Sequence, residues 1–393
     1  VLGEVNSNSE SQRTLPGNVI GNVQIFFIPS ARPPLRREES TEGITTRAAL
    51  LTRASAKELK NDKENHKENL KETKKTVEDT AESLRQLKLA ENSNNSVRYE
   101  EPSLVLPADI EDIDAANDSP MFMSIYIKDI YRYLTRLETV YPIEENYMKN
   151  HNVITGKMRA KLIDWLVEVL DGFLLAETFQ LAVGIIDRYL QVEPDLQKEY
   201  LQLVGVTATL LASKYEEICP PRINDIVYLT AYTYTRNDII KCEMQIMKKL
   251  DFCISRPTPI SFLRRFVKAA QGSSKDHHLA KYFVDLCLVE YSMVHYRPSE
   301  LAAAAICLSL HLLSNTPLQE VWTPTLTYYS EYNFAHIEPI IRKIAQIVLN
   351  VEKSRFRAVQ LKYANPTLLR VSKLPQLKGQ CHICYQLSLS SPT

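Results

Sequence analysis

The chain has 393 residues, of which 45% are hydrophobic and 24% are charged, and its 47 Lys and Arg residues balance 47 Asp and Glu residues. This length accommodates two or three domains of ordinary composition. The zero net charge argues against a protein that binds nucleic acid by neutralising phosphates. No apolar run reaches the roughly 20 residues that span a bilayer. We therefore expect neither a nucleic-acid partner nor a membrane partner.

Residues 1–120 differ from the rest of the chain. Polar and charged residues dominate there, in stretches such as NSNSESQR, RREESTEG and KNDKENHKENLKETKKT. Such a segment buries too little apolar surface to offset its conformational entropy. We expect a disordered tail over residues 1–120, with a transient helix near 55–90 and an acidic end from Ala108 to Ser119.

Helical periodicity defines a first domain, predicted over residues 121–255. Its helices are expected in MFMSIYIKDIYRYLTRLETV, from Ile154 to Phe173, and in AETFQLAVGIIDRYLQ, LQLVGVTATLLASKYEE and RNDIIKCEMQIMKKL. Apolar residues recur in them at helical spacing. The fourth segment is apolar on all sides, which predicts a buried helix. Tyr141-Pro142 ends the first segment, Pro220-Pro221 ends the fourth, and Thr235 caps the fifth.

A second domain is predicted over residues 256–378, after the turn RPTP. Its helices are expected in SFLRRFVKAAQ, HHLAKYFVDLCLVEYSMV, SELAAAAICLSLHLL, a stretch after Thr323-Pro324, and HIEPIIRKIAQIVLN. LVGVTATLLASK can be laid on LAAAAICLSLHL without a gap, which indicates an internal duplication. The predicted fold is all-α, with two tandem five-helix bundles, each around a central helix rich in small residues. Residues 379–393 form a C-terminal tail.

The sequence carries no pattern typical of an enzyme or a metal site. Glycine-rich phosphate loops, activated nucleophile motifs and metal triads are absent. Cys381 and Cys384 form a lone CxxC with no second ligand pair, so we expect no metal and no cofactor. Most of the other cysteines lie in apolar helical patterns as small hydrophobes. Their odd number and irregular spacing predict a reducing compartment.

Several segments, in order, resemble one protein family. Met158-Arg159-Ala160, Asp164-Trp165-Leu166-Val167, LQLVGVTATLLASKYEE, and FLRR with LAKY resemble the cyclins. IIDRYLQ, KYEEICPP, RPTPISFLRR, MVHYRPS, WTPTL and LPQL are most similar to mitotic B-type cyclins. The resemblance covers residues 121–378 and implies two cyclin-box bundles. It also implies a non-catalytic subunit that forms a heterodimer with a mitotic cyclin-dependent kinase, activates it in cytoplasm and nucleus at G2/M, and is destroyed by ubiquitin-dependent proteolysis.

Four residues are candidates for kinase binding. Lys214 ends an apolar helix and Glu243 interrupts an apolar face, although a solvated helix end and a surface acid are an alternative. In the gapless overlay Leu312 matches Lys214, so the fold itself does not require the charge. The resemblance implies that Lys214 and Glu243 hydrogen-bond the kinase's mobile helix and adjacent loop. It also matches Tyr126 and Tyr133 to positions that pack on the kinase, with core packing as the alternative.

Two further groups match substrate-recognition sites of the family. Met158, Leu162, Trp165 and Gln202 match a docking patch, although core packing also explains the spacing of the first three. Lys161 stands where the family usually has Ile, and its charge would repel cationic docking peptides. Arg264, His277 and Lys281 match a phosphate-binding pocket, which implies phosphorylated protein substrates. Converging cations are typical of an anion site, and a solvated basic face is the alternative.

The N-terminal tail contains candidate degradation signals. Lys63-Glu64-Asn65 and Lys67-Glu68-Asn69 are two KEN motifs in tandem, and Arg47 to Leu50 satisfy a minimal RxxL pattern. By resemblance, these motifs imply recognition by the anaphase-promoting ubiquitin ligase.

Two other protein classes stay open at this point. Cyclin-like bundles also occur in general transcription factors, but these would call for a strongly basic face. A helical scaffold would call for more than two repeats.

Overall fold

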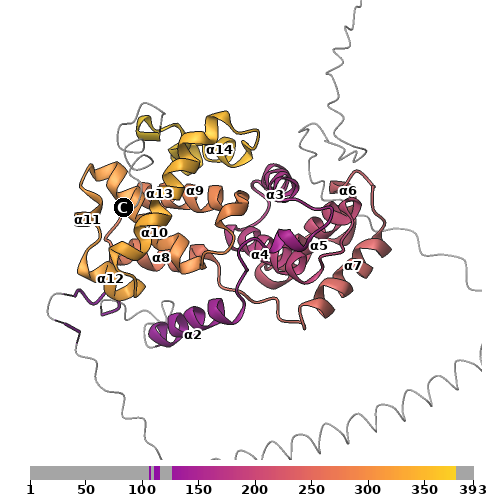
Figure 1. The fold of residues 1–393 in the computed structure, drawn as a ribbon, viewed down its shortest axis with the longest axis horizontal. Coiled ribbons are helices and arrows are strands. Elements are labelled where there is room, and N and C mark those ends of the chain that lie inside the picture. The colour runs from indigo at the N-terminus through magenta and orange to yellow at the C-terminus, as the bar shows by residue number, and fades with distance from the viewer. Residues whose placement is uncertain (1–105, 108–109, 116–125, 378–393) are drawn as a thin grey trace, which may run out of the picture. The chain divides into compact units, whose positions relative to one another are not determined.

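The computed structural model describes residues 106–107, 110–115 and 126–377 (Figure 1). These residues form α-helices and short 3-10 helices, with no strand among them. The predicted all-α class is therefore confirmed. Most of the two predicted tails lies outside the described residues.

The first bundle is built around one buried helix. α2 (Ile127–Val140) precedes the bundle, which comprises α3 (Gly156–Leu170), α4 (Ala176–Val192), α5 (Leu201–Glu216), α6 (Ile223–Leu229) and α7 (Arg236–Lys249). α5 contacts each of the other four bundle helices. The sequence did not predict α6, because seven residues are too few to show helical periodicity.

The second bundle repeats this plan around α10. Its helices are α8 (Pro259–Ala269), α9 (Ser274–Val289), α10 (Pro298–Ser314), α11 (Leu318–Val321), α12 (Pro324–Ser330), α13 (Phe334–Asn350) and α14 (Ala358–Lys362). α10 contacts α8, α9 and α13, and all residues from Leu301 to Ser309 are buried. Short 3-10 helices lie at Tyr147–Asn150, Lys198–Tyr200, Tyr291–Met293, Val351–Lys353, Pro366–Leu368, Val371–Lys373 and Pro375–Leu377.

The end of α5 also fixes the start of α4. α5 ends at Glu216, four residues before the proline pair that was expected to stop it, because Glu217 adopts an extended backbone. The Glu217 carboxylate accepts hydrogen bonds from the Leu175 amide at 2.8 Å and the Thr178 hydroxyl at 2.6 Å. It thereby caps the N-terminus of α4, which has no capping side chain of its own.

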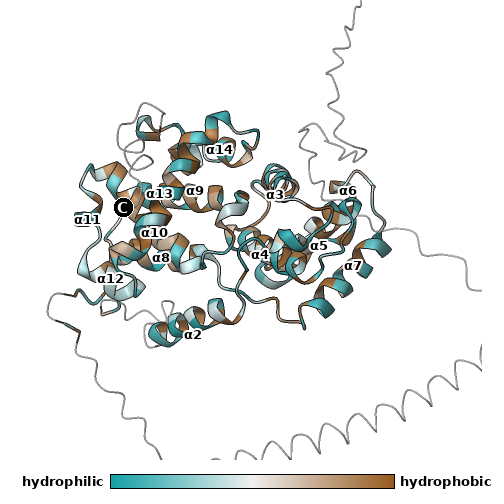
Figure 2. Ribbon diagram, viewed as in Figure 1, coloured by the Kyte–Doolittle hydropathy of each residue, from teal (hydrophilic) through white to brown (hydrophobic). Residues whose placement is uncertain are grey.

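α2 packs on the second bundle although it precedes the first in sequence. The buried carboxylate of Glu138 accepts hydrogen bonds from the Ser299 amide at 3.1 Å and the Ser299 hydroxyl at 2.6 Å. The Tyr131 hydroxyl donates to the Ser261 carbonyl at 2.9 Å. In Figure 2 long stretches of α2 and α7 are teal, as expected for helices at the surface.

The predicted disordered tail is wrong for residues 110–115. The Arg265 guanidinium pairs with both carboxylate oxygens of Asp114, at 3.1 and 2.8 Å, and the two side chains are 6% and 8% exposed. The Ile113 amide donates to the Tyr329 hydroxyl at 3.2 Å. The acidic composition of this stretch is typical of a solvated segment, but its Asp114 pairs with Arg265, a cation buried in the second bundle.

One face of α4 forms the seam between the bundles. Gln180 accepts a hydrogen bond from the Ile260 amide of α8 at 3.0 Å and donates to Asp285 of α9 at 3.4 Å. A Cβ on Gly184 would lie 3.8 Å from the side chain of Arg256 in the linker. Figure 1 shows α4 between α5 and the second bundle. The residues of this seam recur at helical spacing: Glu177, Gln180, Gly184 and Asp187.

Candidate functional site

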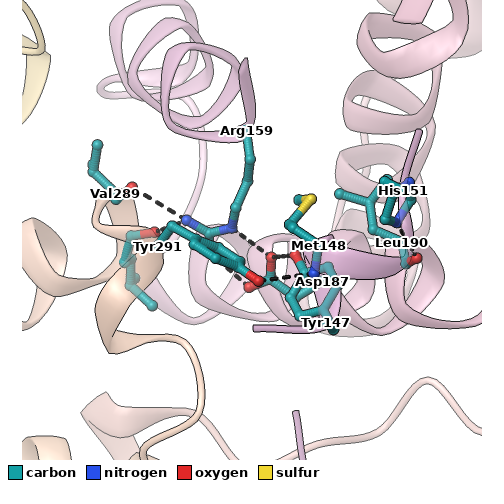
Figure 3. A network of polar contacts seen from close by, with 9 residues as sticks. Tyr147, Met148, His151, Arg159, Asp187, Leu190, Val289 and Tyr291 are labelled. Carbon is teal, nitrogen blue, oxygen red and sulfur yellow. Dashed lines mark hydrogen bonds and ion pairs between the residues drawn. The ribbon is translucent and has the colours of Figure 1, made fainter. Parts of the chain in front are cut away.

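A buried arginine connects the two bundles, through an ion pair in the first and hydrogen bonds to the second (Figure 3). Arg159 is 1% exposed, and its Nε and Nη2 donate to the two oxygens of Asp187 at 2.6 and 2.7 Å. Its Nη1 donates to the Leu288 and Val289 carbonyls at the end of α9, at 2.9 and 3.2 Å. Tyr147 donates its hydroxyl to Asp187 at 2.9 Å. The guanidinium therefore has partners in both bundles, as a buried charge requires.

The Arg159–Asp187 pair is not predictable from the sequence. The available signal was ambiguous, because MRAKLIDWL carries Arg159, Lys161 and Asp164, and VGIIDRYL carries Asp187 and Arg188. Charged residues are rarely fully buried unless they are paired, but the two segments alone do not show which of the five charges are buried together.

The structure brings Lys214 and Glu243 together. Lys214 Nζ in the last turn of α5 forms an ion pair with Glu243 Oε1 on α7, and the side chains are 44% and 19% exposed. Leu312, the matching residue of α10, is buried instead. The pair is therefore a surface feature of the first bundle, accessible to a partner that offers better hydrogen bonds.

Exposed apolar side chains are close to this pair in sequence, on and after α5 and on α7. Ile240 and Met244 flank Glu243 on α7, and both are exposed. Tyr215 is also exposed, and Ile218 in the turn after α5 is 100% exposed. An apolar patch with charged groups at its edge is typical of a protein interface. The sequence points only to the two charged residues, because an outward-facing apolar residue on a helix cannot be told from a core residue by sequence pattern.

Tyr126 and Tyr133 lie on an outward stripe at α2. They are 62% and 59% exposed, and Ile130 between them is exposed as well. Core packing, the alternative explanation, does not account for either tyrosine. Kinase contact stays a prediction for both.

The four predicted docking-patch residues are divided between core and surface. Leu162 and Trp165 are buried, and Leu162 packs against Gly205 of α5. Met158 and Gln202 are half-buried. Core packing therefore accounts for two of the four residues, and docking stays a prediction that rests on the other two.

Arg264, His277 and Lys281 come together where α8 meets α9. Burial, with the charges of His278, Lys281 and Arg264, lowers the pKa of His277 to about 4. Burial also lowers the pKa of Lys281. Arg264, which is 56% exposed, forms an ion pair with Glu177 of α4. The cluster is thus partly desolvated rather than a fully solvated basic face.

A further cation lies beside this cluster, and the sequence did not indicate it. Lys362 of α14 donates to the buried carboxylate of Asp285 at 2.9 Å, and its charge contributes to the lowered pKa of Lys281. The Tyr363 hydroxyl donates to the same Asp285 oxygen at 2.8 Å. α14 follows α9 by many residues, so no local pattern links them.

Other predicted features lie outside the described residues. These are both KEN motifs, the segment from Arg47 to Leu50, and the CxxC of Cys381 and Cys384. Within the part of the chain that the structure describes, no helix is long and apolar enough to cross a membrane. The same residues contain no group of three or more His, Cys, Asp or Glu side chains that could hold a metal ion.

Comparisons with known proteins agree with this two-bundle fold. The family model for the cyclin N-terminal domain matches residues 129–255, and that for the cyclin C-terminal domain matches residues 257–377. A viral cyclin from herpesvirus saimiri superposes with a TM-score of 0.50 at 20% identity, over 56% of this chain and 96% of that chain. That likeness concerns the fold alone.

Three curated relatives are mitotic cyclins. G2/mitotic-specific cyclin-B of Drosophila melanogaster is 46% identical over 280 residues, 69% of this chain and 53% of the relative. Cyclin-B2 of Oryzias luzonensis is 44% identical over 74% of each chain. Cyclin-B1 of Xenopus laevis is 45% identical over 69% of this chain and 68% of its own. This chain thus spans about half the length of the Drosophila relative.

Proposed function

This chain belongs to the cyclin family, and from that premise we propose that it is the non-catalytic, activating subunit of a mitotic cyclin-dependent kinase. The observation that carries the proposal is the Lys214–Glu243 ion pair set among exposed apolar residues of α5 and α7. The similarity of the chain to G2/mitotic-specific cyclins supports a role at entry into and progress through mitosis.

The proposed mechanism is selection of one kinase conformation. The two bundles are connected by Arg159, which pairs with Asp187 in the first and donates to the Leu288 and Val289 carbonyls of the second, so they offer a preformed surface. A rigid surface stabilises whichever kinase state fits it better, here the state with the mobile helix turned inward. On binding, the ion pair between Lys214 and Glu243 is broken, and each residue forms hydrogen bonds with that helix or its adjacent loop instead. The kinase's own ATP, magnesium and catalytic residues perform the chemistry.

Substrate choice is the second part of the proposal. The cluster of exposed Arg264 with half-buried His277 and Lys281 is suited to a phosphoserine or phosphothreonine, which carries close to two negative charges. A substrate that is already phosphorylated would be held there, away from the kinase's catalytic cleft.

Removal of the protein is the third part. The two KEN motifs are proposed to recruit the anaphase-promoting ubiquitin ligase, in both cytoplasm and nucleus. Alanine substitution of both motifs should lengthen the half-life in extract that is leaving mitosis. Decay at the wild-type rate would place the signal elsewhere, with Arg47 and Leu50 as the next candidates.

Co-purification with a tagged, monomeric cyclin-dependent kinase tests the central proposal. A stoichiometric heterodimer that is weakened by Lys214→Ala supports it. Lys249→Ala is the matched control, because Lys249, the last residue of α7, forms a similar surface pair with Glu193 at 2.8 Å. A general transcription factor or a helical scaffold would not retain the kinase.

A further inference from the structure

The predicted phosphate site already contains an anion of its own. Glu177 lies in the first turn of α4 in the first bundle, whereas Arg264, His277 and Lys281 lie on α8 and α9 of the second. The Glu177 carboxylate forms an ion pair with Arg264 Nη2, and its side chain is 19% exposed. The charge of Glu177 also reaches Lys281, where it opposes the lowering of the lysine pKa. One carboxylate therefore interacts with both cations of the candidate phosphate site, Arg264 and Lys281, whereas His277, with its pKa lowered to about 4, is neutral at neutral pH.

The position of this carboxylate is set by its backbone. Glu217 binds the Leu175 amide and the Thr178 hydroxyl on either side of Glu177, which fixes the first turn of α4. The side chain of Glu177 has rotatable bonds beyond that turn, and it is partly exposed to solvent. It can therefore leave Arg264 without any movement of the helix.

We infer that Glu177 is a specificity-determining residue: a built-in carboxylate that competes with incoming anions for the cluster of Arg264, His277 and Lys281. The inference rests on the proposed phosphate site. A ligand carboxylate that displaces Glu177 exchanges one single negative charge for another and gains little. A phosphate monoester brings close to two charges and three acceptor oxygens, enough to bind Arg264 and Lys281 at once. Glu177 thus makes the site reject acidic residues and accept phosphorylated ones.

The test measures anion binding at the cluster itself, in the full-length chain. Histidine rings are labelled for NMR, and the His277 signal is assigned by its loss in His277→Gln. The probes are N-acetyl-phosphoserine methylamide and N-acetyl-glutamate methylamide, at constant ionic strength and slightly above neutral pH, where the phosphate monoester is mainly a dianion.

Glu177→Gln should bind the phosphoserine probe about three- to tenfold more tightly than wild type, since a partly exposed ion pair no longer has to be broken. It should also bind the glutamate probe measurably, whereas the wild type should not. Glu193→Gln is the matched control, because it removes a paired carboxylate at the other end of α4. This control should behave as wild type.

Two different failures are distinguishable. Unchanged or weaker phosphoserine binding by Glu177→Gln would overturn the inference and make Glu177 a residue that positions Arg264. The phosphate site itself is tested by Arg264→Gln/Lys281→Gln, which keeps the His277 signal. If this double variant binds the phosphoserine probe as well as wild type does, the proposed site fails, and the inference fails with it.

Discussion

Lys214 and Glu243 are the residues on which the kinase-binding proposal depends most. Each is the other's ion-pair partner in this chain and would be a hydrogen-bond donor or acceptor to the kinase. Lys214→Ala and Glu243→Ala should each weaken kinase binding by about 2–5 kcal/mol, because truncation leaves other polar groups unpaired in the interface. The free energy of unfolding should change by about 1 kcal/mol or less, as for other surface pairs. Isothermal calorimetry and urea unfolding measure the two effects, and wild-type affinity in both variants would contradict the assignment.

The pKa of His277 tests whether the basic cluster is desolvated. Its pKa is lowered to about 4 by burial and by neighbouring positive charges. The folded state thus binds a proton less readily than the unfolded chain. The stabilisation contributed by the neutral ring is complete above the ordinary pKa and is lost as pH falls from there through about 4. NMR titration should show a neutral ring at neutral pH and a higher pKa in Lys281→Gln. An ordinary pKa in wild type would mean that the cluster is solvated.

Among the elements, α3 packs closely on α5 at Gly205, which leaves no room for a side chain. A Cβ on Gly205 would lie 2.7 Å from Leu162 Cδ1, closer than atoms can approach. Gly205→Ala should therefore destabilise the fold by about 1–3 kcal/mol, despite the better helix propensity of alanine. Gly184→Ala on α4 is the control, because its nearest contact would be an ordinary 3.8 Å. The control should be neutral or more stable by up to about 1 kcal/mol. Thermal unfolding that ranks the two variants in the opposite order would refute this account of the packing.

The elements also show what a sequence can and cannot predict. Helices with strong periodicity or clear caps were predicted well: Thr235 begins α7 with a reciprocal capping box, and α5 and α10 are buried throughout most of their length. α6 was missed because it is short. The docking of α2 and Asp114 on the second bundle was missed because their partners, Ser299 and Arg265, are remote in sequence. Local patterns carry no information about such partners.

The same limit applies to the candidate site. Lys214 and Glu243 were found as charges in apolar surroundings, but their mutual contact joins two helices and appears only in the folded chain. The carboxylate of Glu177 beside Arg264 was not anticipated, since an acid in the first turn of a helix is common and favourable by itself.

At the scale of the whole molecule, Arg159 connects the bundles: it pairs with Asp187 in the first and donates to two backbone carbonyls of the second. Asp187→Asn should lower the free energy of unfolding by about 3–5 kcal/mol, because it leaves the Arg159 charge buried without its counter-ion. Asp129→Asn removes the carboxylate of an exposed pair with Arg132 and should change stability by about 0.5 kcal/mol or less. Urea unfolding of both variants measures the difference. Equal stabilities would show that the buried pair does not stabilise the fold.

Kinase activation tests the central claim most directly. Purified full-length chain is titrated into a monomeric cyclin-dependent kinase, and histone phosphorylation is measured with wild type, the Lys214→Ala/Glu243→Ala double variant and the Lys249→Ala control. The proposed function predicts saturable activation by wild type and the control, and a large loss with the double variant at the same concentration. Absence of activation by wild type at any concentration, or equal activation by the double variant, would contradict it.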